Sequence, residues 1–244
     1  MSKIVIGRQF CGPPNSGNGG YVCGLLAEGF EGAVTAVLRA PIPLDAELTL
    51  QRDPDAHVLL GEAGAPIGNA APAAVVLPEP PPAPSLEAAR AAGERHVGHG
   101  QRIHPICFTC GTAREEGDGL RVFPGQLEGA EPGLVACTWR AHPNFARENG
   151  TIAPEVVWAA IDCPGYFAWV EKEGRHGALL GTMTGEVLKA PRAGEECILV
   201  AWPLAKEGRK EFAGVALYSA DGELMARAHQ VWIVLGPPPG APPA

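Results

Sequence analysis

The sequence predicts an α+β fold in which one unit, a helix followed by a meander of antiparallel strands, occurs twice. The segment VLRAP at 37–41 recurs as VLKAP at 187–191. Each copy is followed by a small acidic turn and an apolar strand, over 45–50 and 194–199. A repeat of this length indicates a duplicated structural unit. Because each unit offers a single helix to cover its strands, the sheets are expected to be antiparallel.

The remaining elements follow the same order in both halves. A short strand is predicted over 4–6, and apolar helical stretches over 21–27 and 156–162 precede the two copies of the repeat. After each copy comes a hairpin with a glycine turn, at Ala63-Gly64 and at Asp221-Gly222. Asp-Gly between apolar runs is a strong signal for a hairpin.

A proline-rich segment separates the halves. Residues 78–84 predict a stiff polyproline II spacer. Ser85 is then expected to cap a short helix from Leu86 to Ala92, with Gly93 at its C′ position. The predicted organisation is an N-terminal half (1–77), a linker with the short helix (78–104), a C-terminal half (105–235) and a disordered tail (236–244).

Composition limits the kinds of partner. The chain has 244 residues, a net charge of −8 and a pI near 5.4, which argues against nucleic acid because a phosphate backbone needs a basic face. No run approaches the 18 apolar residues of a membrane span, and no secretory segment follows Met1. Seven cysteines, an odd number, suit a reducing compartment. A cytoplasmic protein without a membrane span is expected.

Asp162 is a candidate general base. Apolar residues at 157–159 precede it by five, four and three positions, so it shares the helix face that they cover, and Pro164 ends or kinks the helix just beyond it. Burial and the negative end of the helix should raise the pKa of this carboxyl group. The alternative is an aspartate that leads into a Pro-Gly turn with its carboxylate in solvent.

Gln230 is a second candidate, on a strand whose alternation places it on one face with Ala228 and Trp232. Its amide could orient a water molecule or stabilise an intermediate. An exposed polar residue is the alternative. The repeat sets Pro72 opposite Gln230 and Ala27 opposite Asp162, so chemistry is expected only in the second copy.

Asn18, Gly19 and Gly20 begin the first predicted helix. Exposed N–H groups and the positive end of the helix dipole could hold an oxyanion or a carbonyl oxygen of a ligand there. The alternative is a loop with an asparagine N-cap. A dinucleotide-binding fingerprint is excluded, because the last glycine and the βαβ context are both missing.

Histidine and cysteine residues cluster in the middle of the chain, at His96, His99, His104, Cys107 and Cys110. One Cys-x₂-Cys pair without a second matched pair is weak support for zinc, and the histidine spacings fit no standard site. Turn and strand residues near the start of the second half are the better interpretation, so no metal is expected.

Three segments resemble segments of known hotdog thioesterases. NGGYV at 18–22 and the hairpin over 212–230 are similar to segments of the double-hotdog acyl-CoA thioesterases, of the acyl-CoA thioesterase II type. CFTCG at 107–111, followed by DGL at 118–120, resembles the opening of smaller hotdog thioesterases. The resemblance implies a double hotdog with two antiparallel sheets, each wrapping one central helix, with no cofactor and with acyl-CoA as substrate. Homo-oligomers are also expected, since such proteins often pair further through sheet edges or faces.

The resemblance also implies a catalytic set. It consists of an aspartate on the second-half helix, matching Asp162, a closing glutamine, matching Gln230, and a threonine or serine on the strand before VLKAP. Thr182 and Thr184 both fit that threonine by position and point to the same strand face.

The leading hypothesis is therefore hydrolysis of an acyl-CoA thioester. The acyl chain would lie between the two helices, in contact with Trp158. Arg209 and Lys210 are candidate contacts for the CoA phosphates. An enoyl-CoA hydratase is a weaker alternative, because the histidine expected five residues after an aspartate is replaced by Phe167 after Asp162. A non-catalytic acyl-CoA or lipid-binding protein is the other alternative.

Overall fold

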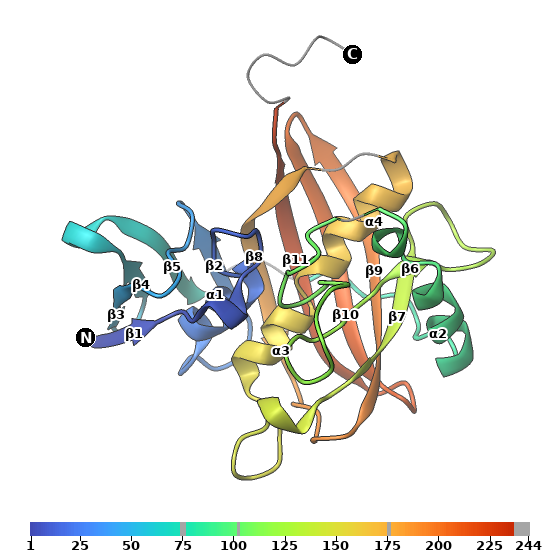
Figure 1. Cartoon of the computed structure of the whole chain (residues 1–244), viewed down its shortest axis with the longest axis horizontal. Coiled ribbons are helices and arrows are strands. Elements are labelled where there is room, and N and C mark those ends of the chain that lie inside the picture. The colour runs from blue at the N-terminus through green and yellow to red at the C-terminus, as the bar shows by residue number, and fades with distance from the viewer. Residues whose placement is uncertain (74–76, 102, 175–176, 237–244) are drawn as a thin grey trace.

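A single antiparallel sheet forms the centre of the molecule. The computed structural model describes residues 1–73, 77–101, 103–174 and 177–236. Eleven strands lie in the order β1-β3-β4-β5-β2-β8-β11-β10-β9-β7-β6 (Figure 1). Among the described residues, every pairing between these strands is antiparallel.

The N-terminal half supplies five strands and one helix. The helix is α1 (Gly19–Ala27), and its N-cap is Asn18. The strands are β1 (Ser2–Val5), β2 (Val34–Leu38), β3 (Glu47–Arg52), β4 (His57–Leu60) and β5 (Pro66–Pro72). The β4–β5 hairpin turns at Ala63 and Gly64, as the sequence predicts, and both residues have positive φ.

The C-terminal half repeats this arrangement with longer strands. Its strands are β6 (Gly125–Gln126), β7 (Val135–Arg140), β8 (Ala178–Val187), β9 (Glu196–Glu207), β10 (Lys210–Ser219) and β11 (Leu224–Val234). The order β7-β9-β10-β11-β8 matches β1-β3-β4-β5-β2 position by position. The repeated VLxAP segment lies at the end of β2 in one half and of β8 in the other, so the predicted duplication is confirmed in the topology.

The two halves join edge to edge through equivalent strands. β2 pairs with β8, with Thr35 opposite Thr184 and Val37 opposite Thr182. The expectation of two separate sheets is therefore corrected: each half has its own helix, but the strands form one continuous sheet. Pairing the two edges satisfies backbone groups that would otherwise template aggregation.

The second-half helix is longer than predicted and is broken. α3 (Pro154–Ala160) and α4 (Cys163–Glu173) are separated at Ile161 and Asp162. Pro164 lies in the first turn of α4, where its missing N–H costs no hydrogen bond, so it begins the second segment instead of ending the helix. α1 packs against α3, and α4 covers β9 and β10.

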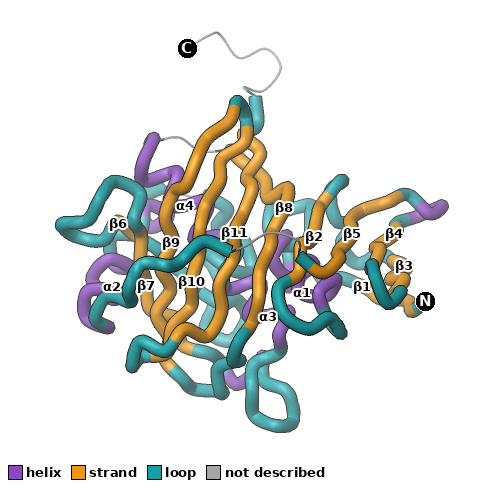
Figure 2. Tube along the Cα trace, turned by 180° about the vertical axis from the view of Figure 1, so that it is seen from behind, coloured by secondary structure: helices purple, strands orange, loops and turns teal. Residues whose placement is uncertain are grey.

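The linker lies on the opposite face of the sheet. Figure 2 shows the segment before α2 crossing that face, and the Tyr218 hydroxyl group donates to the carbonyl of Pro81. Ser85 caps α2 (Leu86–Glu94) as predicted, accepting a hydrogen bond from the Ala88 N–H. Gly93 is inside this helix and not after it, and it lies against the Phe123 carbonyl oxygen, where a side chain would crowd the contact.

The two halves share one hydrophobic core, formed by α1, α3, α4 and the sheet face that they cover. In the part of the chain that the structure describes, no helix is both long and apolar enough to cross a bilayer. The predicted disordered tail lies outside the described residues from 237 onward.

Candidate functional site

Asp162 lies in the break between α3 and α4, where it meets the start of α1. Its Oδ2 atom accepts a hydrogen bond of 2.9 Å from the Gly20 N–H. Its Oδ1 atom has no hydrogen-bond partner among the described residues, although the side chain is only 3% exposed. A buried polar atom without a partner is unusual and marks a position where a ligand or a water molecule can bind.

Burial raises the pKa of Asp162 to about 7, because the charged form loses its water shell. The Gly20 N–H, which donates to Oδ2, opposes this rise, and the nearby Cys107 adds to it. The Asn18 amide also lowers the pKa, but its Nδ2 atom donates to Thr109 and not to the carboxylate, so Oδ1 keeps no hydrogen-bond partner among the described residues. The direction agrees with the expectation from the apolar helix face. Asp162 follows the C-terminus of α3 but also stands at the N-cap of α4, so the positive end of α4 opposes the effect expected from the α3 C-terminus.

Gly20 has no room for a side chain. A Cβ atom there would lie 2.5 Å from the Asp162 Cβ and 2.6 Å from the Trp158 carbonyl oxygen. The absence of a side chain lets the first turn of α1 approach the helix break closely enough for the N–H to reach the carboxylate. The predicted close approach of a glycine backbone is present, but the partner of the N–H is Asp162.

Asn18 has the structural role weighed as the alternative. Its Oδ1 atom accepts from the Tyr21 N–H and caps α1, and its Nδ2 atom donates to the Thr109 hydroxyl group at 3.2 Å. Gly19 is the remaining member of this predicted trio. Its N–H makes no hydrogen bond within the described residues, and the residue lines a cavity beside Asp162.

Gln230 is fully buried and anchors the helix break. Its Nε2 atom donates to the carbonyl oxygens of Ile161 at 2.7 Å and Asp162 at 2.8 Å. Its Oε1 atom accepts from the Trp232 indole N–H at 2.8 Å. Gly165 leaves the space that this amide occupies, since a Cβ there would clash with Oε1. The structure therefore brings Gln230 and Asp162 together, through the Asp162 backbone and not its carboxylate.

The structure does not bring Thr182 and Thr184 to this site. Gln230 is directly opposite Met183 in the β8–β11 pairing, so Met183 shares its face of the sheet. Thr182 and Thr184 are one position away from Met183 on either side and point to the other face. The Thr184 hydroxyl group instead bonds the Thr35 hydroxyl group across the joint between the halves, at 2.9 Å.

The other predicted substrate contacts, Trp158, Arg209 and Lys210, are not among the residues that line the cavity. Trp158 is a buried residue of α3 whose ring lies against Gly185 of β8, and it is not among the residues that line the cavity. Arg209 and Lys210 lie at the β9–β10 turn, and Lys210 pairs with Ile233, which does line the cavity. Neither cationic side chain is among the lining residues.

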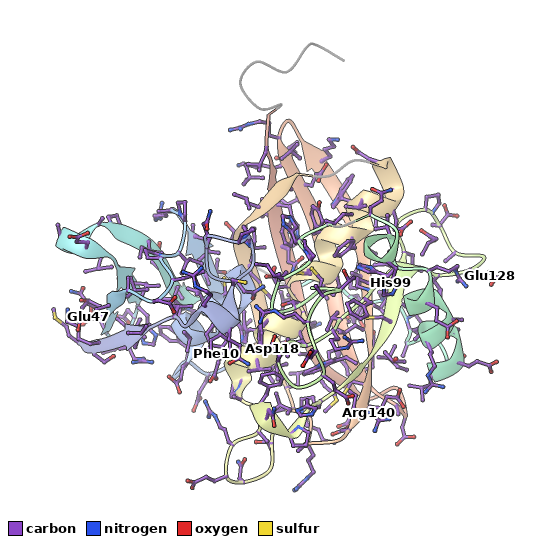
Figure 3. The ribbon with its side chains drawn as sticks, viewed as in Figure 1. Phe10, Glu47, His99, Asp118, Glu128 and Arg140 are labelled. Atoms are coloured by element: carbon purple, nitrogen blue, oxygen red, sulfur yellow. The ribbon has the colours of Figure 1, made fainter. Side chains whose placement is uncertain are left out.

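Thr109 is a member of the site that sequence reasoning missed. Its hydroxyl group donates to the Ala159 carbonyl oxygen at 2.8 Å and accepts from the Asn18 side chain. It therefore connects the start of α1 to the end of α3, next to the helix break. The loop that carries it also holds the N-terminal segment: Gln9 donates to the Asp118 carbonyl oxygen, and Figure 3 shows Phe10 beside Asp118. The CFTCG motif, which contains Thr109, could have indicated this role, but the hydrogen-bond partners Asn18 and Ala159 lie far from it in the sequence.

A cavity of about 620 Å³ opens beside Asp162. Its walls come from the loops before α1 and after β2, from the start of β8 and from the end of β11. Most of the side chains in the strand walls are apolar, among them Leu38, Leu179, Leu180, Trp232 and Ile233. Among the described residues that line it, Asp162 is the only acidic one and Arg39 the only lysine or arginine. An apolar chamber with one carboxylate in its wall suits a ligand with a long apolar part and one reacting polar group.

Two solved structures share this architecture over nearly the whole chain. A protein described as a thioesterase from Novosphingobium aromaticivorans has 15% sequence identity and a TM-score of 0.63, covering 96% of this chain and 95% of that one. The TesB protein of Mycobacterium avium subspecies paratuberculosis has 14% identity and a TM-score of 0.57, covering 92% and 89%. Neither a protein-family model nor a curated protein sequence matches the chain. This likeness and the duplicated topology show that the chain has the α+β double-hotdog fold that these two proteins share.

Proposed function

We propose that this protein hydrolyses acyl-CoA thioesters and that Asp162 is the general base. The observation that carries the proposal is the unpartnered Oδ1 atom of Asp162 in the wall of an apolar cavity. The Oδ2 atom accepts a hydrogen bond from the Gly20 N–H, which fixes the orientation of the carboxylate and therefore the position of Oδ1. The shared fold supports the choice of reaction class.

In the proposed reaction, a water molecule bound to Oδ1 gives up a proton to Asp162 as its oxygen attacks the thioester carbonyl carbon. The tetrahedral intermediate then collapses, the carbon–sulfur bond breaks, and the thiolate leaves with the proton that Asp162 took. The products are a carboxylic acid and free CoA thiol. The Gly19 N–H, at the first position of α1, is positioned to stabilise negative charge on the carbonyl oxygen.

Gln230 acts as a positioning residue in this proposal. Its three hydrogen bonds fix the backbone at Ile161 and Asp162 and the indole of Trp232, which lines the cavity. The acyl chain would lie against Leu180 and Trp232, and among the described lining residues the exposed Arg39 is the cation that could contact a CoA phosphate.

The test is release of free CoA from a panel of acyl-CoA substrates by wild type and two variants. Asp162→Asn keeps the size of the side chain and an acceptor for Gly20 but removes the base, so kcat/KM should fall by about 100- to 10,000-fold. Asp53→Asn, at an exposed position outside the site, should match wild type. Equal rates for Asp162→Asn and wild type would remove Asp162 from the mechanism.

A non-catalytic acyl-CoA-binding protein is the second candidate. The observation in its favour is the placement of Thr182 and Thr184 on the other face of the sheet, which leaves Asp162 without the hydroxyl partner that the family resemblance implies. Tight acyl-CoA binding in calorimetry without release of CoA from any member of the panel would support this candidate over hydrolysis.

A further inference from the structure

Three buried thiols meet beside Asp162. Cys107 and Cys110 belong to the loop before β6, and Cys163 is the first residue of α4. Their sulfur atoms all lie within 4.8 Å of one another, and those of Cys107 and Cys163 are 3.7 Å apart. Cys107 and Cys163 are 56 positions apart in the chain, so the fold assembles the cluster. Among the described residues, this is the only group of three or more such side chains close enough to share an ion.

The loop is shaped to present two sulfurs together. The backbone N–H groups of Thr109 and Cys110 donate to the Cys107 sulfur, and the Gly111 N–H donates to the Cys107 carbonyl oxygen at 2.9 Å. A side chain at Gly111 would clash with that carbonyl oxygen, so the turn requires glycine. Backbone N–H groups aimed at a sulfur stabilise the thiolate, which is the form that binds metal ions.

The sulfur separation fits metal ligation better than a disulfide. A tetrahedral ion with zinc–sulfur bonds of about 2.3 Å sets its sulfurs about 3.8 Å apart. A disulfide needs about 2.05 Å. The 3.7 Å between Cys107 and Cys163 is close to the first value, and the third sulfur needs only a small shift.

The chemistry of the donors selects the kind of ion. Three thiolates form a soft set, which favours zinc over magnesium or calcium. The other four cysteines do not share this arrangement: Cys23, Cys137 and Cys197 belong to no such group, and Cys11 accepts a hydrogen bond from Arg114. All seven cysteines are buried, but only these three bring their sulfur atoms together among the described residues.

We propose that Cys107, Cys110 and Cys163 bind one zinc ion. All three residues line the cavity, so the fourth position of the ion faces it, on the side where Asp162 and His104 also lie. The ion would tie the 104–111 loop to the helix break and so hold Asp162 in place. The Cys-x₂-Cys spacing of Cys107 and Cys110 is only weak support for this site in the sequence, because the third thiol comes from a helix in another part of the chain.

The first test measures the zinc content of the full-length protein, purified under reducing conditions, by inductively coupled plasma mass spectrometry. About one zinc per chain is expected. Cys107→Ser, Cys110→Ser and Cys163→Ser should each lose the ion, whereas Cys137→Ser, a matched control at a buried cysteine outside the cluster, should keep it. Equal zinc content in all five proteins would overturn the proposal.

The second test does not depend on the variants folding. Wild-type protein stripped of metal is titrated with Co²⁺ under reducing conditions. Thiolate-to-cobalt charge-transfer absorption that saturates near one equivalent would support the site. A reduced, folded wild type that shows no such absorption and retains no zinc would overturn it. Neither readout involves turnover, so metal binding can fail while thioester hydrolysis stands, and the reverse.

Discussion

The hydrogen bonds of Gln230 allow a test of whether this residue holds the helix break in place or takes part directly in catalysis. Gln230→Met keeps the length of the side chain and removes its three hydrogen bonds, to Ile161, Asp162 and Trp232. Each lost bond to a carbonyl oxygen should cost about 1 kcal/mol, and the buried indole N–H left without a partner about 1–3 kcal/mol more. The free energy of unfolding should therefore fall by about 3–5 kcal/mol.

The assay is urea unfolding followed by tryptophan fluorescence, with CoA release measured on the same preparations. We expect a lower midpoint with an unchanged m-value and, in folded protein, a lower kcat because the Asp162 backbone is no longer held. Gln51→Met, at a partly exposed strand position, should change stability by less than about 0.5 kcal/mol. A large loss of kcat in Gln230→Met with unchanged stability would refute this reasoning and support direct catalysis by the amide.

Three further predictions follow from contacts described above. Gly20→Ala should destabilise the protein by about 1–3 kcal/mol and reduce turnover, because its Cβ would crowd Asp162. Gly7→Ala, with open space around it, should be close to neutral. Equal stabilities of the two variants in thermal unfolding would contradict this prediction. Thr184→Val should cost about 1 kcal/mol in urea unfolding, less in a Thr35→Val background, and leave kcat unchanged; a loss of kcat would return Thr184 to the site. Burial lowers the pKa of His96 to about 4, so below about pH 6.5 the unfolded state gains a proton that the folded state does not, and stability should fall by about 3 kcal/mol between pH 6.5 and 4. His96→Gln should remove that part of the pH dependence, and an unchanged slope in the variant would contradict the assignment.

The topology could be predicted because the chain carries it twice. The VLxAP repeat, the acidic turns and the two glycine hairpins each mark equivalent points of the halves, and all recur in the observed strand order. The joining of the sheets could not be predicted in the same way, because the β2–β8 pairing depends on contacts between residues about 150 positions apart, which no local pattern specifies.

The site was predictable only in part, for two physical reasons. Alternation along β11 correctly placed Gln230 with Trp232, but the β8–β11 register shifts between Val231 and Trp232, and only the pairing shows that Met183 faces Gln230. The broken helix was the other obstacle. Pro164 is compatible with either the end of one helix or the start of the next, and the choice decides what surrounds Asp162 and Cys163.

The most direct measurement is a crystal structure with a non-hydrolysable acyl-CoA analogue. We expect the acyl chain in the cavity between Leu180 and Trp232, and the carbonyl carbon separated from the free oxygen of Asp162 by one water molecule, with contacts of about 3 Å on each side. An analogue bound with its carbonyl group outside this cavity, or with Asp162 unable to reach it through a water molecule, would contradict the proposed mechanism.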